Sequence, residues 1–269
     1  MNEWQIIPEI VGCNAALRRA ALKSMETVEA GHSLLIEGAP GTGRRLLARC
    51  AWARRKPGSR SLFTLDCRLF GSEATEETLL GATAAMGTTH PRIHSGMNGG
   101  VLLLHVEELS RHTQERVLRL IEAQRQRNSG VQLLMTCATE ENSHEALLPA
   151  LSGLVQKVRV PALCERIEDI RPITESFLRN ASPFERVRCS QAMYEKFCAY
   201  DWPGNVTQLR GVLRRLMMLP HDGLLDIGLL AELMFRDDTC YALLEGMPPA
   251  SQMPGMTMMP PAAEGRSIV

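Results

Sequence analysis

The chain has 269 residues, 45% of them hydrophobic, and its 30 basic side chains are balanced by 30 acidic ones. This length allows one sizeable core and a second small one, while the zero net charge excludes a global field that would draw the chain to nucleic acid or to a membrane surface. The eight cysteines form no CxxC pair, the first residues lack a signal-peptide pattern and no apolar run approaches the roughly 18 residues of a membrane span, so we expect a cytoplasmic protein with no membrane contact.

A glycine-rich loop follows the first predicted strand. An apolar run at residues 33–37 precedes it, and helix-like spacing of apolar residues over 46–52 follows it. Strand, glycine-rich turn and helix form the context of a phosphate-binding loop, whose backbone N–H groups surround phosphate oxygens at the positive end of the helix dipole. An ordinary strand-to-helix turn without ligand is the alternative. The residues predicted to bind nucleotide are Gly38, Ala39, Pro40, Gly41, Thr42, Gly43, Arg44 and Arg45.

Two side chains of this loop depart from the usual pattern. Arg44 stands where a lysine would reach the β- and γ-phosphates, and a planar guanidinium does not simply take over from a compact ammonium. Arg45 stands where many such loops carry a hydroxyl that binds magnesium. The loop therefore predicts that ATP or ADP can bind, but it lacks the usual side-chain ligand for Mg²⁺.

Strand-like runs alternate with helical patterns in the first part of the chain and stop near residue 167. Strands are expected at residues 34–36, 62–65, 101–104, 131–136 and 155–160, and short helices at 170–179, 190–199, 206–219 and 227–235. The alternation predicts an α/β fold with a mainly parallel sheet flanked by helices. We predict an α/β subdomain over residues 1–165, a small helical subdomain over 166–240 and a disordered, Met- and Pro-rich tail over 241–269.

The order of these segments resembles the central AAA+ domain of sigma-54-dependent transcription activators, also called bacterial enhancer-binding proteins. Residues 200–206 match the family motif YDWPGNV, which is very specific at this length. Residues 38–44 resemble its GESGTGK loop, 99–104 its GGTLFL strand and 166–170 its RREDI segment. The resemblance covers residues 10–240 and implies an AAA+ P-loop fold with a helical lid, nucleotide binding and contacts between neighbouring subunits.

The acidic pair that follows GGTLFL in this family is altered. In the family its aspartate organises magnesium and its glutamate polarises the attacking water. Counting forward from the GGTLFL match puts His105 and Val106 at these places, and counting back from the next helix puts Leu104 and His105 there. Neither count selects Glu107 or Glu108, which we interpret as acidic residues that open the following helix.

Two further catalytic features of the family are missing. The asparagine that senses the γ-phosphate is replaced by Ala138, Thr139 or Glu140, depending on the register. The arginine fingers that reach a neighbouring subunit's nucleotide fall on Ala146 and Ser152. These positions carry no group that could perform the family's roles.

The arginine that follows WPGNV in the family is Thr207 in this chain. Arg210 lies one helical turn further and could replace it only if the helix were rotated or shifted. With Arg214 and Arg215 it forms a basic face that is either a phosphate-contacting patch or an ordinary exposed helix surface. With this many independent positions altered, we assign no catalytic residue and expect hydrolysis to be lost.

The features that contact partners in this family are also reduced. The loop that carries GAFTGA and engages sigma-54 is missing between residues 81 and 99, and no DNA-binding helix-turn-helix is evident after residue 240. His90 and His94 have the spacing of ligands on one helix, but Pro91 lies between them, so we predict no metal site. We expect the partner to be an AAA+ transcription activator or a second copy of this chain, rather than sigma-54 or DNA.

Three functions remain open from the sequence. The first is a hydrolysis-deficient regulator of transcription that acts through contacts with an active AAA+ activator. The second is an ATP-hydrolysing activator with unusual catalytic residues, in which Glu107 or Glu108 holds magnesium and Arg44 serves the phosphates. The third is a scaffold that binds no nucleotide.

Overall fold

The computed structural model describes residues 10–54, 62–69, 99–127, 132–139, 147–181 and 186–236. Within these ranges the elements are, in chain order and with η marking a 3₁₀ helix, α1 (Ala15–Glu29), β1 (Leu34–Gly38), α2 (Arg44–Ala53), β2 (Leu62–Asp66), η2 (Cys67–Leu69), β3 (Gly100–Leu104), η3 (Val106–Glu108), α4 (Arg111–Arg127), β4 (Gln132–Ala138), α6 (Pro149–Leu154), β5 (Gln156–Arg159), η4 (Leu163–Asp169), α7 (Ile170–Ala181), β6 (Arg188–Cys189), α8 (Gln191–Ala199), α9 (Asn205–Leu216), β7 (Leu224–Leu225) and α10 (Ile227–Arg236).

Some of the features that the sequence predicts lie outside the described residues. They are His90 and His94, the shortened segment 82–98, Glu140, Ala146 and the tail 241–269.

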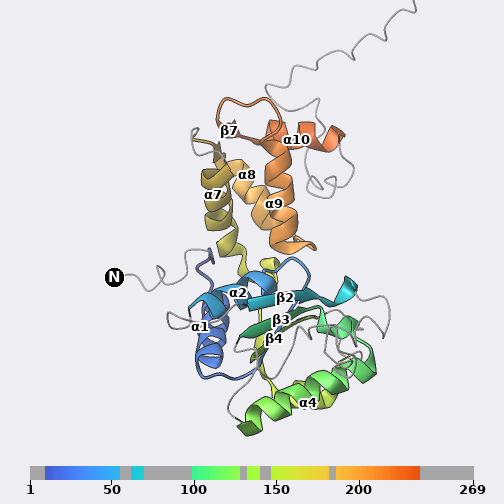
Figure 1. Cartoon of the computed structure of the whole chain (residues 1–269). Helices are drawn as coiled ribbons and strands as arrows, with labels where there is room; N and C mark the ends of the chain where they lie inside the picture. Colours follow the sequence, from blue (N-terminus) through green and yellow to red (C-terminus); the bar gives the residue numbers. More distant parts are fainter. Residues whose placement is uncertain are drawn as a thin grey trace, which may run out of the picture.

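The five main strands form one parallel sheet, as the alternating sequence pattern predicts (Figure 1). Their order is β2-β3-β4-β1-β5, so β1 lies between β4 and β5. The three inner strands β3, β4 and β1 are largely buried because both faces of the sheet are covered there, which is usual for a parallel sheet, whereas the edge strand β5 is mostly exposed. Leu34 and Ile36 of β1 belong to the core that α1 and α2 cover, whereas Leu35 packs on the opposite face with α4 and α6. This arrangement holds the carboxyl ends of β1, β3 and β4 at one edge.

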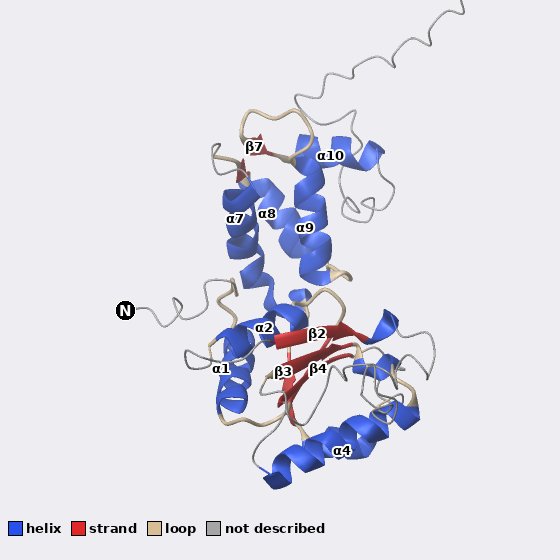
Figure 2. Cartoon of the chain, viewed as in Figure 1, coloured by secondary structure: helices blue, strands red, loops and turns tan. Residues whose placement is uncertain are grey.

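The helices that follow residue 170 form a separate group beside the sheet (Figure 2). Their core centres on Trp202, which is 1% exposed and lies edge-on to Phe197 and Tyr200, with ring centroids 5.4 Å and 5.2 Å away. Its indole N–H donates to the carbonyl of Phe197 over 2.7 Å. The YDWPGNV motif is therefore the centre of a packed helical unit.

A short two-stranded sheet in this helical part was not predicted. Arg188 and Cys189 of β6 pair in parallel with Leu224 and Leu225 of β7. The expectation that strands end near residue 167 is therefore wrong for these four residues. A two-residue strand has no measurable alternation of apolar and polar residues, so sequence periodicity does not detect it.

Candidate functional site

The predicted phosphate loop connects β1 to α2 at the carboxyl edge of the sheet. Gly41 and Gly43 have φ angles of 78° and 103°, which favour glycine, and Gly43 is the N-cap of α2. The hydroxyl of Thr42 donates to the carbonyl of Ala39 over 2.8 Å and tightens the turn. A Cβ atom at Gly41 would lie 2.2 Å from the carbonyl oxygen of Gly204, so the lid backbone closes directly onto the loop.

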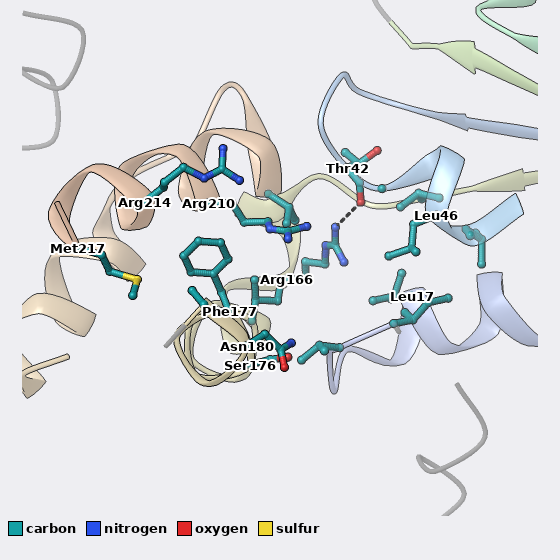
Figure 3. A pocket seen from close by; sticks show the side chains of 18 residues that line it. Leu17, Thr42, Leu46, Arg166, Ser176, Phe177, Asn180, Arg210, Arg214 and Met217 are labelled. Carbon is teal, nitrogen blue, oxygen red and sulfur yellow. Dashed lines mark hydrogen bonds between the residues drawn. The ribbon is translucent and has the colours of Figure 1, made fainter. Parts of the chain in front are cut away.

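Two buried polar side chains from the lid region hold carbonyl groups of this loop. The amide of Asn205 donates to the Pro40 carbonyl over 2.9 Å, and the guanidinium of Arg166 donates to the Thr42 carbonyl over 2.8 Å, as the dashed line in Figure 3 shows. Asn205 also accepts a hydrogen bond from the N–H of Leu163 over 2.7 Å, so its orientation is fixed from both sides. The loop is thereby anchored through its carbonyls, and its conformation depends on the lid.

The two arginines of the loop have different surroundings. Arg44 is only 6% exposed, whereas Arg45 is exposed to solvent. Burial raises the pKa of the Cys137 thiol to about 12, the charge of Glu107 adds to this, and the nearby Arg44 guanidinium opposes it. The Arg44 side chain therefore lies among groups at the carboxyl ends of the strands and does not extend into solvent.

The interpretation that Glu107 and Glu108 open the following helix is wrong. Helix α4 begins only at Arg111, and Glu107 lies in the 3₁₀ turn directly after β3. Its side chain is 7% exposed, its Oε1 accepts a hydrogen bond from the N–H of Ala138 over 2.9 Å, and the same oxygen is 3.4 Å from Nδ1 of His105. The side chain is thus turned back to the strand ends. Glu108, in contrast, is exposed.

The backbone conformation of His105 explains why the Glu107 side chain turns back to the strand ends. His105 has φ 58° and ψ 55°, a left-handed conformation that is uncommon for a residue other than glycine. Its N–H donates to the hydroxyl of Thr136 over 3.1 Å, and Val106 is then fully buried. The turn places the Glu107 side chain, which neither count selected, beside the end of β4.

Four other positions that the sequence comparison singles out lie within the described residues: Ala138, Thr139, Ser152 and Thr207. The N–H of Ala138 is bound by Glu107, and the N–H of Thr139 donates to the Gly38 carbonyl over 3.3 Å. Ser152 is a half-buried residue of α6, and Thr207 is exposed at the start of α9. In the described part of the chain, no group of three or more His, Cys, Asp or Glu side chains could hold a metal ion.

A cavity of about 660 Å³ lies between the phosphate loop and the lid (Figure 3). Thr42 and Gly43 line it from the loop, and Arg210 and Arg214 of α9 line it from the lid. The guanidinium of Arg210 lies 5.4 Å from the centre of the Phe177 ring, which is also part of the wall. Both arginines are exposed, yet they border this cavity, so the basic face of α9 is more than an ordinary outer surface.

The buried state of Cys137 gives a first testable prediction. Because its pKa is raised to about 12, almost no thiolate forms near pH 8, and we expect no alkylation of Cys137 in the folded protein during a brief iodoacetamide pulse. Cys164 is exposed and serves as the internal control. Glu107→Gln should leave Cys137 protected, because burial is the larger cause of its raised pKa. Peptide mass spectrometry measures both, and equal labelling of Cys137 and Cys164 would contradict the arrangement.

Comparison with known proteins identifies two family matches along the chain. A sigma-54 interaction domain matches residues 10–148, and an AAA+ ATPase lid domain matches residues 164–240. Among curated proteins, the chain is similar to the HTH-type transcriptional regulatory protein TyrR of Enterobacter agglomerans, with 29% identity over 234 residues that cover 77% of this chain and 44% of the relative. It is 30% identical over 210 residues to the regulatory protein LuxO of Vibrio parahaemolyticus, covering 70% and 46% of the two chains.

The fold is shared with solved structures. NtrX from Brucella abortus in complex with ATP superimposes with a TM-score of 0.71 and 24% identity, over 82% of this chain and 54% of that one. The predicted AAA+ P-loop fold is thereby confirmed. The chain spans about half the length of the curated relatives it matches. Within its described part, no helix combines the length and apolar character needed to cross a membrane.

Proposed function

Because this chain belongs to the sigma-54 interaction domain family, we propose that it is a transcription-regulating AAA+ protein that does not hydrolyse ATP and acts through contacts with an active AAA+ activator. The observation that carries the proposal is the arrangement at the strand ends. There, His105 follows β3, the Glu107 carboxylate is bound to the backbone of β4, and Arg44 is buried.

Hydrolysis in a P-loop protein requires a metal that bridges the phosphates and a group that orients the attacking water. The side chains present do not fit Mg²⁺: Arg45 replaces the loop hydroxyl, and His105 follows the strand where the family has its aspartate. Glu107 Oε1 is held by the N–H of Ala138, which is a structural use of the carboxylate. These three features support the loss of turnover.

One observation favours the runner-up, an ATPase with unusual residues. Oε2 of Glu107 is buried and has no hydrogen-bond partner within the described part of the chain. A buried carboxylate oxygen at the strand ends is the kind of group that could polarise a water molecule. A single oxygen is nevertheless far from the near-octahedral set that Mg²⁺ requires, so we rank this function second.

A turnover assay separates these two functions. We expect the purified full chain to release phosphate from ATP roughly 100-fold or more slowly than an active sigma-54-type activator, since loss of acid–base assistance alone costs about 10²–10⁴ in rate. Glu107→Gln should leave this background unchanged, and Glu108→Gln is the matched control on the exposed neighbour. Steady turnover that Glu107→Gln abolishes would establish the runner-up function.

The regulatory part of the proposal concerns assembly. A subunit that binds its neighbours without supplying an arginine finger or a metal site alters the cycle of a ring while performing no chemistry itself. We propose that this binding takes place in the cytoplasm and that the partner is an AAA+ activator or a second copy of this chain. The similarity to TyrR, an HTH-type transcriptional regulatory protein, and to the regulatory protein LuxO supports the transcriptional role. The test is to add the chain to a purified sigma-54-type activator and to record co-elution and turnover; unchanged behaviour in both would favour a scaffold unrelated to such rings.

A further inference from the structure

The cavity between the loop and the lid meets the phosphate loop at two of its residues. Thr42 and Gly43 line it, whereas the residues at the strand ends, Arg44, His105 and Glu107, do not. In a phosphate-binding loop the backbone N–H groups meet the first phosphates, and the lysine position lies towards the last ones. The cavity is therefore continuous with the place of the first phosphates.

Two described side chains at the strand ends are packed inside the protein. Arg44 is 6% exposed and Glu107 has a side chain that is 7% exposed, so both are packed away from solvent. Their charges shift the pKa of the Cys137 thiol in opposite directions, and the Cys137 side chain is itself fully buried near the end of β4. A third phosphate with its metal ion would require this packed group to separate. A ligand that ends at its second phosphate would not.

The positive charge of the cavity wall can balance the negative charge of a diphosphate, so no metal ion is needed for this purpose. None of the described residues that line it is acidic, and three of them are arginines: Arg166, Arg210 and Arg214. Arg166 is already committed to the carbonyl of Thr42, so Arg210 and Arg214 are the cations available to an anion. Arg210 lies over the ring of Phe177, which places an aromatic wall and a guanidinium together.

We propose that this cavity binds a nucleoside diphosphate without Mg²⁺ and in preference to the triphosphate, with Arg210 and Arg214 supplying the positive charge. The apolar walls receive the base, and the loop N–H groups and the two lid arginines receive the phosphates. The inference rests on the proposed AAA+ function and on the nucleotide binding that the phosphate loop predicts, and it adds the ligand class and its independence from metal.

Calorimetric titration of the full chain with ADP and ATP, each in EDTA and in Mg²⁺, tests this directly. We expect ADP to bind with dissociation constants that agree within about threefold in the two buffers, and ATP to bind about tenfold more weakly than ADP. Arg210→Gln and Arg214→Gln should each weaken ADP binding about tenfold, because a charge-assisted contact to phosphate is lost. Arg188→Gln, on an exposed arginine of β6 that does not line the cavity, is the matched control.

A second variant tests the role of the buried Arg44. Arg44→Lys replaces the guanidinium by a compact ammonium, so ATP should gain affinity relative to ADP if Arg44 excludes the third phosphate. Thermal melting in EDTA, with and without ADP, verifies that each variant is folded. ATP binding that is tighter than ADP binding, a requirement for Mg²⁺, or no nucleotide binding at all would each overturn the inference. None of these results decides the proposed function, which the turnover and ring-assembly assays test separately.

Discussion

Replacing Gly41 by alanine is expected to destabilise the protein by roughly 3 kcal/mol and to lower its melting temperature by about 10 °C. Two costs add in this variant. Gly41 has φ 78°, a left-handed conformation that costs a residue with a Cβ atom roughly 1–2 kcal/mol. The new Cβ atom would also lie 2.2 Å from the carbonyl oxygen of Gly204, which belongs to the backbone and cannot rotate away. The lid must therefore move, and denaturant unfolding followed by tryptophan fluorescence measures the loss.

Gly43 provides the matched control for this experiment. It has φ 103°, but no atom lies within 4 Å of a Cβ built on it. Gly43→Ala should therefore cost only the conformational part, about 1–2 kcal/mol. If Gly41→Ala and Gly43→Ala were equally destabilised, the close approach of the lid to the loop would not exist in solution.

The sheet was predictable because its strands are long enough to show a pattern. The runs at residues 34–36 and 101–104 are continuous and apolar, and the run at 131–136 is mostly so, as expected where both faces of a parallel sheet are covered. The lid helices were predictable for a similar reason, since YDWPGNV and the helical spacing after it are specific. The β6–β7 pair was not, because two residues in each strand carry no periodicity.

Of the candidate site, only the phosphate loop was predictable, because it is formed by residues that are neighbours in the sequence. The glycine positions of the loop follow from the sequence, and the structure gives Gly41 and Gly43 the positive φ angles that such a turn needs. Glu107 was missed because its position depends on the left-handed backbone of His105, which a strand pattern does not reveal. The contacts of Arg166 and Asn205 with the loop join residues 124 and 165 positions apart, so no local spacing indicates them.

Loss of Arg166 should have the largest effect on stability. Arg166 is 3% exposed and Asp169 is fully buried, and their charged atoms Nη1 and Oδ2 lie 3.8 Å apart. Burial lowers the pKa of Arg166, while the charge of Asp169 opposes this shift. Arg166→Ala leaves the carboxylate of Asp169 in the protein interior without its cation, and breaking a buried pair in this way typically costs about 3–5 kcal/mol. It also removes the hydrogen bond to the Thr42 carbonyl, so the phosphate loop loses one of its anchors.

The neighbouring Arg159–Glu165 pair shows why burial decides the size of this effect. Its charged atoms are closer, at 2.8 Å, but its side chains are 65% and 41% exposed, so Arg159→Ala should cost less than about 1 kcal/mol. A double-mutant cycle of Arg166→Ala with Asp169→Asn isolates the buried pair, and we expect a coupling of about 1–3 kcal/mol in denaturant unfolding. Additive effects would mean that Arg166 stabilises the protein mainly through Thr42. In that case Arg166→Ala would still loosen the loop. The buried carboxylate of Asp169 would then be stabilised mainly through its other oxygen, Oδ1, which accepts hydrogen bonds from the N–H groups of Cys13 and Asn14.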